Sequence, residues 1–244
     1  MTIEPRLGGQ TVVVIGGSAG IGLETARQAR AEGAEVILAG RDAGRLESAA
    51  AMLGAAGTAA FDADDSAALE DFFAGLEGPI DHVMVTAGGP YYATLAEMDF
   101  DKGRRGLQQH PMLMVGVARF GAPKVRPGGT LLFMGGTGGR NPAQGVGLVS
   151  AMTAALPALT ASLALEIAPV RINLIAAGFV DTPLSASLLG EGLQARRDEL
   201  SAALPIGRVV GPADVGALAV HLMINTALTG ATYDIDGGQG LLSL

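Results

Sequence analysis

Short apolar segments alternate with longer amphipathic segments along the whole chain. The apolar segments have the length and β-branched composition of buried strands. They predict strands at 11–15, 35–39, 58–61, 81–86, 130–134, 171–176 and 232–235. The segments between them have apolar residues at helical spacing and predict helices at 23–32, 42–54, 66–76, 95–98, 107–125, 151–168 and 212–225. This alternation, without linker or repeat, predicts one doubly wound parallel α/β domain over residues 1–244, with helices on both faces of the sheet.

The first predicted strand ends in a glycine-rich turn, Gly16 to Gly22, that leads into the first helix. A strand, such a turn and a helix place bare backbone N–H groups and the positive end of the helix against a phosphate. Glycines are needed there because a side chain would hold a diphosphate away from those groups. The spacing is Gly-x-x-x-Gly-x-Gly, so a tight turn without any ligand is the alternative interpretation.

The second predicted strand ends in Gly40 and Arg41, where a dinucleotide fold places the adenosine ribose. An acidic residue would accept a bond from the ribose 2′-OH and select NAD. A guanidinium instead binds a 2′-phosphate, so Arg41 favours NADP(H) over NAD(H). The alternative is that Arg41 is an ordinary solvated turn residue.

A second glycine-rich strand end, residues 87–90, is expected beside the first, at the sheet edge where such folds bind ligands. His82, inside the preceding strand, is expected to be a structural histidine with its hydrogen bonds satisfied. Segment 184–200 predicts one or two polar helices that form a substrate lid.

Composition narrows the classes of function. The 244 residues are 49% hydrophobic and 16% charged, which excludes extensive disorder. A net charge of −8 without a basic run argues against nucleic-acid binding, and the absence of Cys together with three scattered His predicts neither a disulfide nor a metal site. The start of the chain has no apolar signal core, and the apolar segment 149–167 is interrupted by polar residues. We therefore expect a soluble cytoplasmic protein without a membrane span.

Several motifs in order resemble those of the short-chain dehydrogenase/reductase family, a Rossmann-fold family, over nearly the whole chain. The turn after the first strand resembles its Thr-Gly-x-x-x-Gly-x-Gly cofactor loop, with Ile15 in place of Thr. The segments at 62–63, 85–88, 171–183 and 236–238 resemble, in turn, the family's adenine-contacting Asp, its Asn-Asn-Ala-Gly, the segment that closes over the nicotinamide, and its C-terminal Asp-Gly-Gly. The resemblance implies an NAD(P)-binding oxidoreductase. The cofactor residues that we predict are Gly16, Ser18, Ala19, Gly20, Ile21, Gly22, Gly40, Arg41, Asp62, Ala63, Ala87, Gly88, Gly178, Val180 and Thr182.

The positions of the family's catalytic residues are different here. The family uses a Tyr to exchange a proton with the substrate oxygen, a Lys four residues later that lowers the pKa of this Tyr from about 10, a Ser and an Asn. Aligning the Ala-Ala-Leu that begins at Ala154 puts Val149 at the Tyr and Thr153 at the Lys. The same comparison puts Gly136 at the Ser and His110 at the Asn. The resemblance therefore implies a divergent member without the Ser-Tyr-Lys residues.

Four side chains are candidates for relocated proton chemistry: His110, Tyr91, Tyr92 and Thr137. An imidazole with a pKa near 6.5 is a competent acid or base, and Thr137 can donate to a carbonyl. The structural alternatives are aromatic packing at the rim for the two tyrosines and an N-terminal helix residue for His110. Three functions stay open: a redox enzyme acting on a small carbonyl or alcohol compound, a non-redox isomerase or dehydratase, and a cofactor-binding module without catalysis.

The helix expected at 151–168 is apolar around most of its circumference, with alanines at 151, 154, 155, 158, 161 and 164. A helix of this kind is buried on two sides. The sheet covers one side, so we expect a second subunit on the other, in a homodimer or homotetramer.

Overall fold

The computed structural model describes residues 5–140 and 143–242. Its strands are β1 (Thr11–Ile15), β2 (Glu35–Gly40), β3 (Gly57–Ala60), β4 (Ile80–Val85), β5 (Val125–Gly136), β6 (Arg171–Ala177) and β7 (Thr232–Ile235). Its α-helices are α1 (Gly20–Ala31), α2 (Ala43–Leu53), α3 (Ser66–Ala74), α4 (Phe100–Gly121), α5 (Gly147–Glu166), α6 (Pro183–Leu189), α7 (Leu193–Ala203) and α8 (Pro212–Ile224). Short 3₁₀ turns follow α4 (Ala122–Lys124), β5 (Thr137–Gly139), α6 (Gly190–Gly192) and β7 (Gln239–Leu241).

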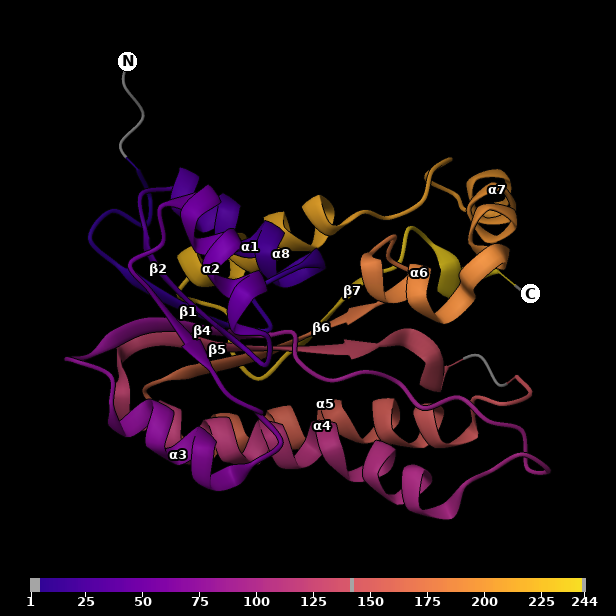
Figure 1. Ribbon diagram of the computed structural model, residues 1–244, viewed down its shortest axis with the longest axis horizontal. Helices are drawn as coiled ribbons and strands as arrows, with labels where there is room; N and C mark the ends of the chain where they lie inside the picture. Colours follow the sequence, from indigo (N-terminus) through magenta and orange to yellow (C-terminus); the bar gives the residue numbers. More distant parts are fainter. Residues whose placement is uncertain (1–4, 141–142, 243–244) are drawn as a thin grey trace.

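The strands of the described chain form one parallel sheet in the order β3-β2-β1-β4-β5-β6-β7. Helices α1, α2 and α8 cover one face, and α3, α4 and α5 cover the other (Figure 1). The order reverses between β1 and β4, which is the switch point at which sheets of this type bind ligands. The predicted doubly wound α/β fold is confirmed.

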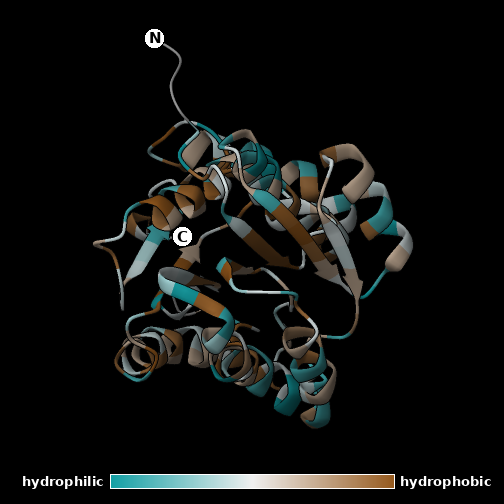
Figure 2. Ribbon diagram, turned by 90° about the vertical axis from the view of Figure 1, so that its left-hand side faces the viewer, coloured by the Kyte–Doolittle hydropathy of each residue, from teal (hydrophilic) through white to brown (hydrophobic). Residues whose placement is uncertain are grey.

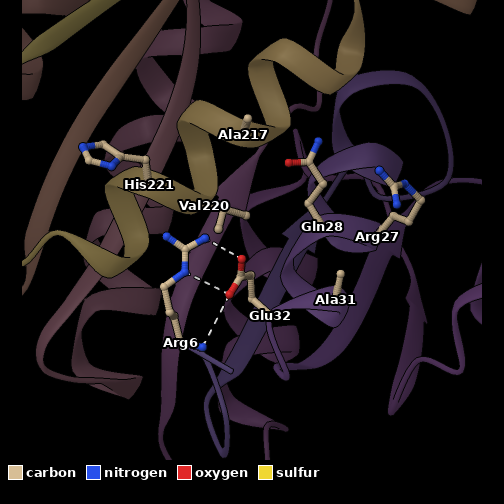
Figure 3. A pocket seen from close by; sticks show the side chains of 8 residues that line it. All are labelled: Arg6, Arg27, Gln28, Ala31, Glu32, Ala217, Val220 and His221. Atoms are coloured by element: carbon tan, nitrogen blue, oxygen red, sulfur yellow. Dashed lines mark hydrogen bonds and ion pairs between the residues drawn. The ribbon is translucent and has the colours of Figure 1, made fainter. Parts of the chain in front are cut away.

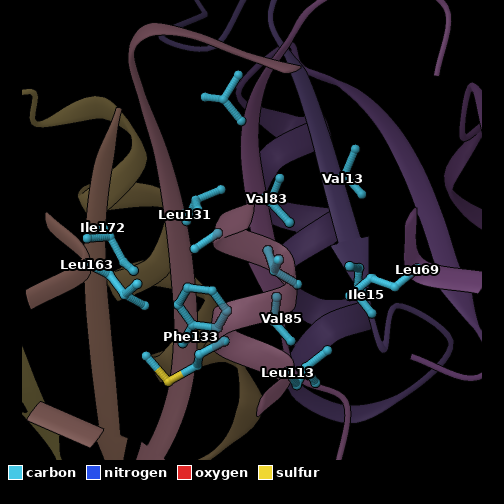
Figure 4. Packing of buried hydrophobic residues seen from close by; sticks show 14 of the residues in the cluster. Val13, Ile15, Leu69, Val83, Val85, Leu113, Leu131, Phe133, Leu163 and Ile172 are labelled. Atoms are coloured by element: carbon cyan, nitrogen blue, oxygen red, sulfur yellow. The ribbon is translucent and has the colours of Figure 1, made fainter. Parts of the chain in front are cut away.

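The alternation of side chains along β1 explains why this strand is apolar throughout. Val12 and Val14 pack under α1, α2 and α8, whereas Val13 and Ile15 pack under α3, α4 and α5. All four side chains have no exposed surface. Figure 4 shows the second of these layers, in which Val13 and Ile15 lie beside Val83, Val85 and Phe133. Coloured by hydropathy, the central strands are brown between the two helical layers (Figure 2).

Several predicted boundaries differ from the structure. Residues 95–97 form a turn, so the helix predicted at 95–98 is wrong. Helix α4 begins seven residues earlier than predicted because the Asp99 carboxylate caps it by accepting from Asp101 N and Lys102 N. Helices α1 and α5 also begin earlier than predicted, at Gly20 and Gly147. Strand β5 begins five residues before the predicted strand at 130–134 and contains a bulge, since Ile80 pairs with Val125 and His82 with Thr130.

Helix α5 is long and apolar enough to cross a membrane by length and composition alone. One side of it is part of the core, because Met152, Leu156 and Leu163 pack against the sheet. Its outer side is exposed in the single chain and includes Ala151, Ala154, Ala155, Ala158, Ala161 and Leu165. The prediction that one side lies on the sheet is therefore confirmed.

Candidate active site

The carboxyl ends of β1, β4, β5 and β6 lie at one edge of the sheet, because all these strands are parallel. The structure thus brings together the predicted glycine-rich turn at 16–22, the predicted strand end at 87–90, and the segments 136–139 and 178–182 that follow β5 and β6. The side of this edge next to β2 and β3 carries Arg41 and Asp62. The predicted cofactor residues therefore share one edge of the sheet.

Two glycines of the first loop are required by packing against β4. Gly16 has a φ of 96°, and a Cβ built on it would lie 2.4 Å from Thr86 Oγ1. A Cβ on Gly22 would lie 2.3 Å from the carbonyl oxygen of Gly16. The Thr86 hydroxyl donates to this same oxygen at 3.1 Å. The sequence reasoning did not single out Thr86, which holds the loop against the end of β4.

The start of α1 is suited to an anion. Its N-cap residue, Ala19, makes no side-chain capping bond, and its first turn contains no acidic residue. The first N–H groups of a helix have no partner within the helix, and the helix dipole adds positive potential there. Gly20 has a φ of 55°, and a Cβ on it would still be 3.6 Å or more from its neighbours. Ser18, Ala19 and Ile21 are half-buried around this turn.

On the adenosine side, Gly40 ends β2 and pairs with Ala60 of β3. Arg41 is exposed, and its guanidinium has no hydrogen-bond or ion-pair partner in residues 5–140 and 143–242. The next residue, Asp42, caps α2 by accepting from Arg45 N at 3.0 Å. Asp62 is exposed after β3 and accepts from Asp64 N at 3.1 Å, while Ala63 packs on the core.

On the opposite side, Gly178 lies where a Cβ would be 2.8 Å from Asp236 Cβ and 2.7 Å from Gln239 Oε1. Gln239 also accepts from Phe179 N at 2.9 Å, a contact that no sequence motif indicated. Val180 forms a bridge with Val210. Thr182 caps α6 by accepting from Ser185 N at 3.2 Å. The predicted lid segment, 184–200, lies within α6 and α7, where one or two helices were expected.

His110 lies at the switch point, in the middle of α4 rather than at its start as the structural alternative required. Its ring packs on Gly88, where a Cβ would lie 3.0 Å from His110 Cε1. Its Nδ1 atom is buried and has no hydrogen-bond partner in the described chain. Burial lowers the pKa of His110 below 6.5, and the carboxylate of Asp64 partly opposes this. The imidazole is therefore neutral at pH 7 and able to accept a proton.

The other candidates are placed less favourably for proton chemistry. The Tyr91 hydroxyl accepts from Asp99 N at 3.0 Å, and its ring fills the space left by Gly106. Tyr91 thus fixes the start of α4. Tyr92 is 51% exposed at the rim, and partial burial raises the pKa of its hydroxyl. Thr137 is buried after β5.

Of the residues that the resemblance aligns with the family's Ser, Lys and Tyr, Gly136 and Thr153 are neighbours in space, and Val149 lies near Gly138. A Cβ on Gly136 would lie 3.4 Å from Thr153 Cγ2, and one on Gly138 would lie 3.8 Å from Val149 Cγ1. The Thr153 hydroxyl donates within its own helix, to the carbonyl of Val149 at 2.9 Å. The described part of the chain therefore places no proton-transferring side chain at Gly136 or Val149.

Two cavities lie away from this edge. One, of about 340 Å³, lies between α1 and α8, where Arg6 pairs with Glu32 (Figure 3). The other, of about 660 Å³, lies between the ends of α4 and α5. Within the described ranges, no cluster of three or more His, Cys, Asp or Glu residues could hold a metal ion.

Known proteins resemble this chain over almost its full length. A family model described as Enoyl-(Acyl carrier protein) reductase matches residues 16–239. Short-chain dehydrogenase/reductase ATR9 from Stachybotrys chlorohalonatus is 31% identical, with coverage of 97% of this chain and 99% of the relative. An NADP-dependent (R)-specific alcohol dehydrogenase from Lentilactobacillus kefiri is 28% identical, with 96% and 97% covered. A crystal structure of a small-chain dehydrogenase in complex with NADPH matches with a TM-score of 0.82 at 26% identity, covering 96% of this chain and 99% of that one.

Proposed function

Because the chain belongs to the short-chain dehydrogenase/reductase family, we propose that it is an NADP(H)-dependent oxidoreductase with a non-standard proton donor. Its substrate is a small carbonyl or alcohol compound. The observation that carries this proposal is the glycine turn at the uncapped start of α1, next to the His110–Gly88 contact. The turn would supply an anion site, and the contact supports a proton-transferring group at the same sheet edge.

The residues of the turn fit a dinucleotide. The backbone of Gly20, which carries no side chain, and the first N–H groups of α1, which has no side-chain cap, would hold the diphosphate. Thr182 and Val180 would close the far side, and Asp62 and Ala63 would flank the adenine. When bound, the nicotinamide supplies or accepts the hydride.

The cofactor preference follows from Arg41. Its guanidinium is exposed at the end of β2 and lacks a partner in the described chain. It is free to pair with a 2′-phosphate, which NADP(H) carries and NAD(H) lacks. An NADP-dependent relative and a structural neighbour with NADPH support this assignment.

The proton is assigned to His110. Gly136 and Val149 have no group that exchanges a proton, and the Thr153 hydroxyl is occupied within α5. His110 is neutral at pH 7 because burial lowers its pKa, so it accepts the proton of an alcohol and returns it in the reverse direction. Thr137 donates a hydrogen bond to the substrate oxygen.

One observation favours a second function. A neutral imidazole, at a sheet edge where Gly136 and Val149 carry no group that exchanges a proton, is also suited to removing a proton from carbon next to a carbonyl. The same site would then catalyse an isomerisation or dehydration without hydride transfer.

The first test is isothermal titration of the protein with NADPH and NADH, followed by NADPH oxidation over a panel of aldehydes and ketones. We expect tighter binding of NADPH and turnover of at least one carbonyl compound. Binding of NADPH without oxidation, together with proton exchange at a substrate carbon, would favour the second function. Absence of heat with either dinucleotide would reject both the cofactor and the hydride chemistry.

The outer side of α5 supports a homodimer or homotetramer. It presents alanines that allow close helix approach, and Leu165 is 85% exposed. Next to it, α4 exposes Met112 at 63%. A second copy that packs against this side would bury both.

A further inference from the structure

The segment that carries α6 and α7 leaves the sheet and returns to it at the same place. Val180 and Val210 form a parallel bridge, and Asp181 N donates to the carbonyl of Val210 at 3.0 Å. Both ends of the excursion are therefore fixed together. Figure 1 shows α6 and α7 beyond the end of β6.

An ion pair joins the beginning of this excursion to its second helix. Arg197 of α7 donates from Nε and Nη2 to the two carboxylate oxygens of Asp181, at 2.9 and 2.8 Å. The side chains are 37% and 32% exposed, so solvent screens the pair only in part. Two parallel bonds of this kind fix the orientation of the carboxylate as well as its position.

Thr182, the residue directly after Asp181, faces the glycine turn. It caps α6, with its N–H donating to Ser185 Oγ at 2.7 Å. A Cβ on Gly20 would lie 3.6 Å from Thr182 Cβ, so the Thr182 side chain lies beside the glycine turn of the proposed dinucleotide site. A displacement of Asp181 would therefore move Thr182 relative to the start of α1.

We propose that Arg197 is a positioning residue of the dinucleotide site, which holds Thr182 against the glycine turn through Asp181. This inference rests on the proposed cofactor function. In the part of the chain that the structure describes, the Arg197–Asp181 ion pair links α7 to the 178–182 turn. The inference gives α7 a role in cofactor retention, whereas the sequence connected this helix only with the substrate.

The test compares Arg197→Ala with Arg196→Ala. Arg196 is the matched control because it lies one position earlier on the same helix and pairs with Glu199 of that helix at 2.7 Å. NADPH affinity is measured by titration, and NADPH release by stopped-flow fluorescence. For Arg197→Ala we expect a dissociation constant about fivefold higher, mainly through faster release, as loss of a partly exposed ion pair implies. The ratio of NADPH to NADH affinity should stay unchanged because Arg41 is intact.

A purely structural role for Arg197 would lower the melting temperature and leave the release rate of the folded protein unchanged. Exchange of the charges, Asp181→Arg with Arg197→Asp, should restore part of the slow release. If Arg197→Ala does not fold, Arg197→Gln is used in its place, because it keeps most of the aliphatic stem of the side chain. Equal release rates for the Arg197 and Arg196 variants, or a swapped pair no better than the single variants, would overturn the inference while leaving the proposed function intact. Failure of the wild type to bind either dinucleotide would overturn both.

Discussion

Acid should destabilise this protein through His82, which lies in the central strand β4. The side chain is 3% exposed, its Nε2 is 2.7 Å from Gln10 Oε1, and its Nδ1 has no partner in the described chain. Burial lowers the pKa of His82 from 6.5 to about 4, and the charge of Arg171 adds to this while Asp81 opposes it. The expected structural histidine is thus buried, but only one of its nitrogens is satisfied.

The sign of the effect follows from proton uptake. In the unfolded chain His82 takes up a proton below pH 6.5, whereas in the folded chain it stays neutral down to about pH 4. The free energy of unfolding therefore falls as the pH falls through this window. The full difference corresponds to about 3.4 kcal/mol, of which about 2.5 kcal/mol is lost between pH 7.5 and 4.5. Since total stabilities are about 5–15 kcal/mol, this loss is large.

Urea unfolding at pH 7.5 and 4.5 measures this loss in the free energy of unfolding. The variant is His82→Gln, and the control is His221→Gln, at an exposed position. On acidification, the free energy of unfolding should fall by the same amount in the wild type and in the His221 variant. In His82→Gln it should fall by about 2.5 kcal/mol less. Carboxylates and His110 contribute equally to all three proteins. An equal loss in His82→Gln would show that the buried imidazole is not the acid-sensitive group.

Three further predictions concern the site and the assembly. Arg41→Ala should reduce the affinity for NADPH about tenfold or more, as loss of a charged hydrogen bond implies, and leave NADH affinity unchanged; equal losses in titration would contradict the role of Arg41. His110→Ala should lower turnover by about 10² or more with little change in NADPH affinity, and full activity in a steady-state assay would remove His110 from the mechanism. Ala158→Glu, on the outer side of α5, should give monomers in light scattering at micromolar concentration. A wild type that is already monomeric would contradict the predicted interface.

The fold was predictable because its strands are buried on both faces. Such strands are continuous apolar runs, and all the predicted strands occur in the structure. The helix starts were less predictable, since they depend on single capping residues. Asp99 adds seven residues to α4, and at Gly20 the helix begins inside the turn without any cap.

The candidate site was predictable only where a motif required a particular residue. The glycine turns and Arg41 follow from local chemistry, but the partners that hold them do not. Thr86 reaches the glycine turn from a different strand, and Gln239 reaches Phe179 from the end of the chain. Contacts between residues so far apart leave no local pattern.

The glycines of the turn are not all required for the same reason. Gly16 and Gly22 are explained by the close approach of the loop to β4, because a side chain at either would collide with Thr86 or the backbone. Their presence would be needed even in a protein that had lost its cofactor. Gly20 has no such neighbour, and the start of α1 and Arg41 carry positive potential without partners in the described chain. A bound dinucleotide would pair with the start of α1 and with Arg41, whereas the φ of 55° at Gly20 already requires a glycine there. The proposal of a dinucleotide site therefore depends on the start of α1 and on Arg41 rather than on the glycine motif as a whole.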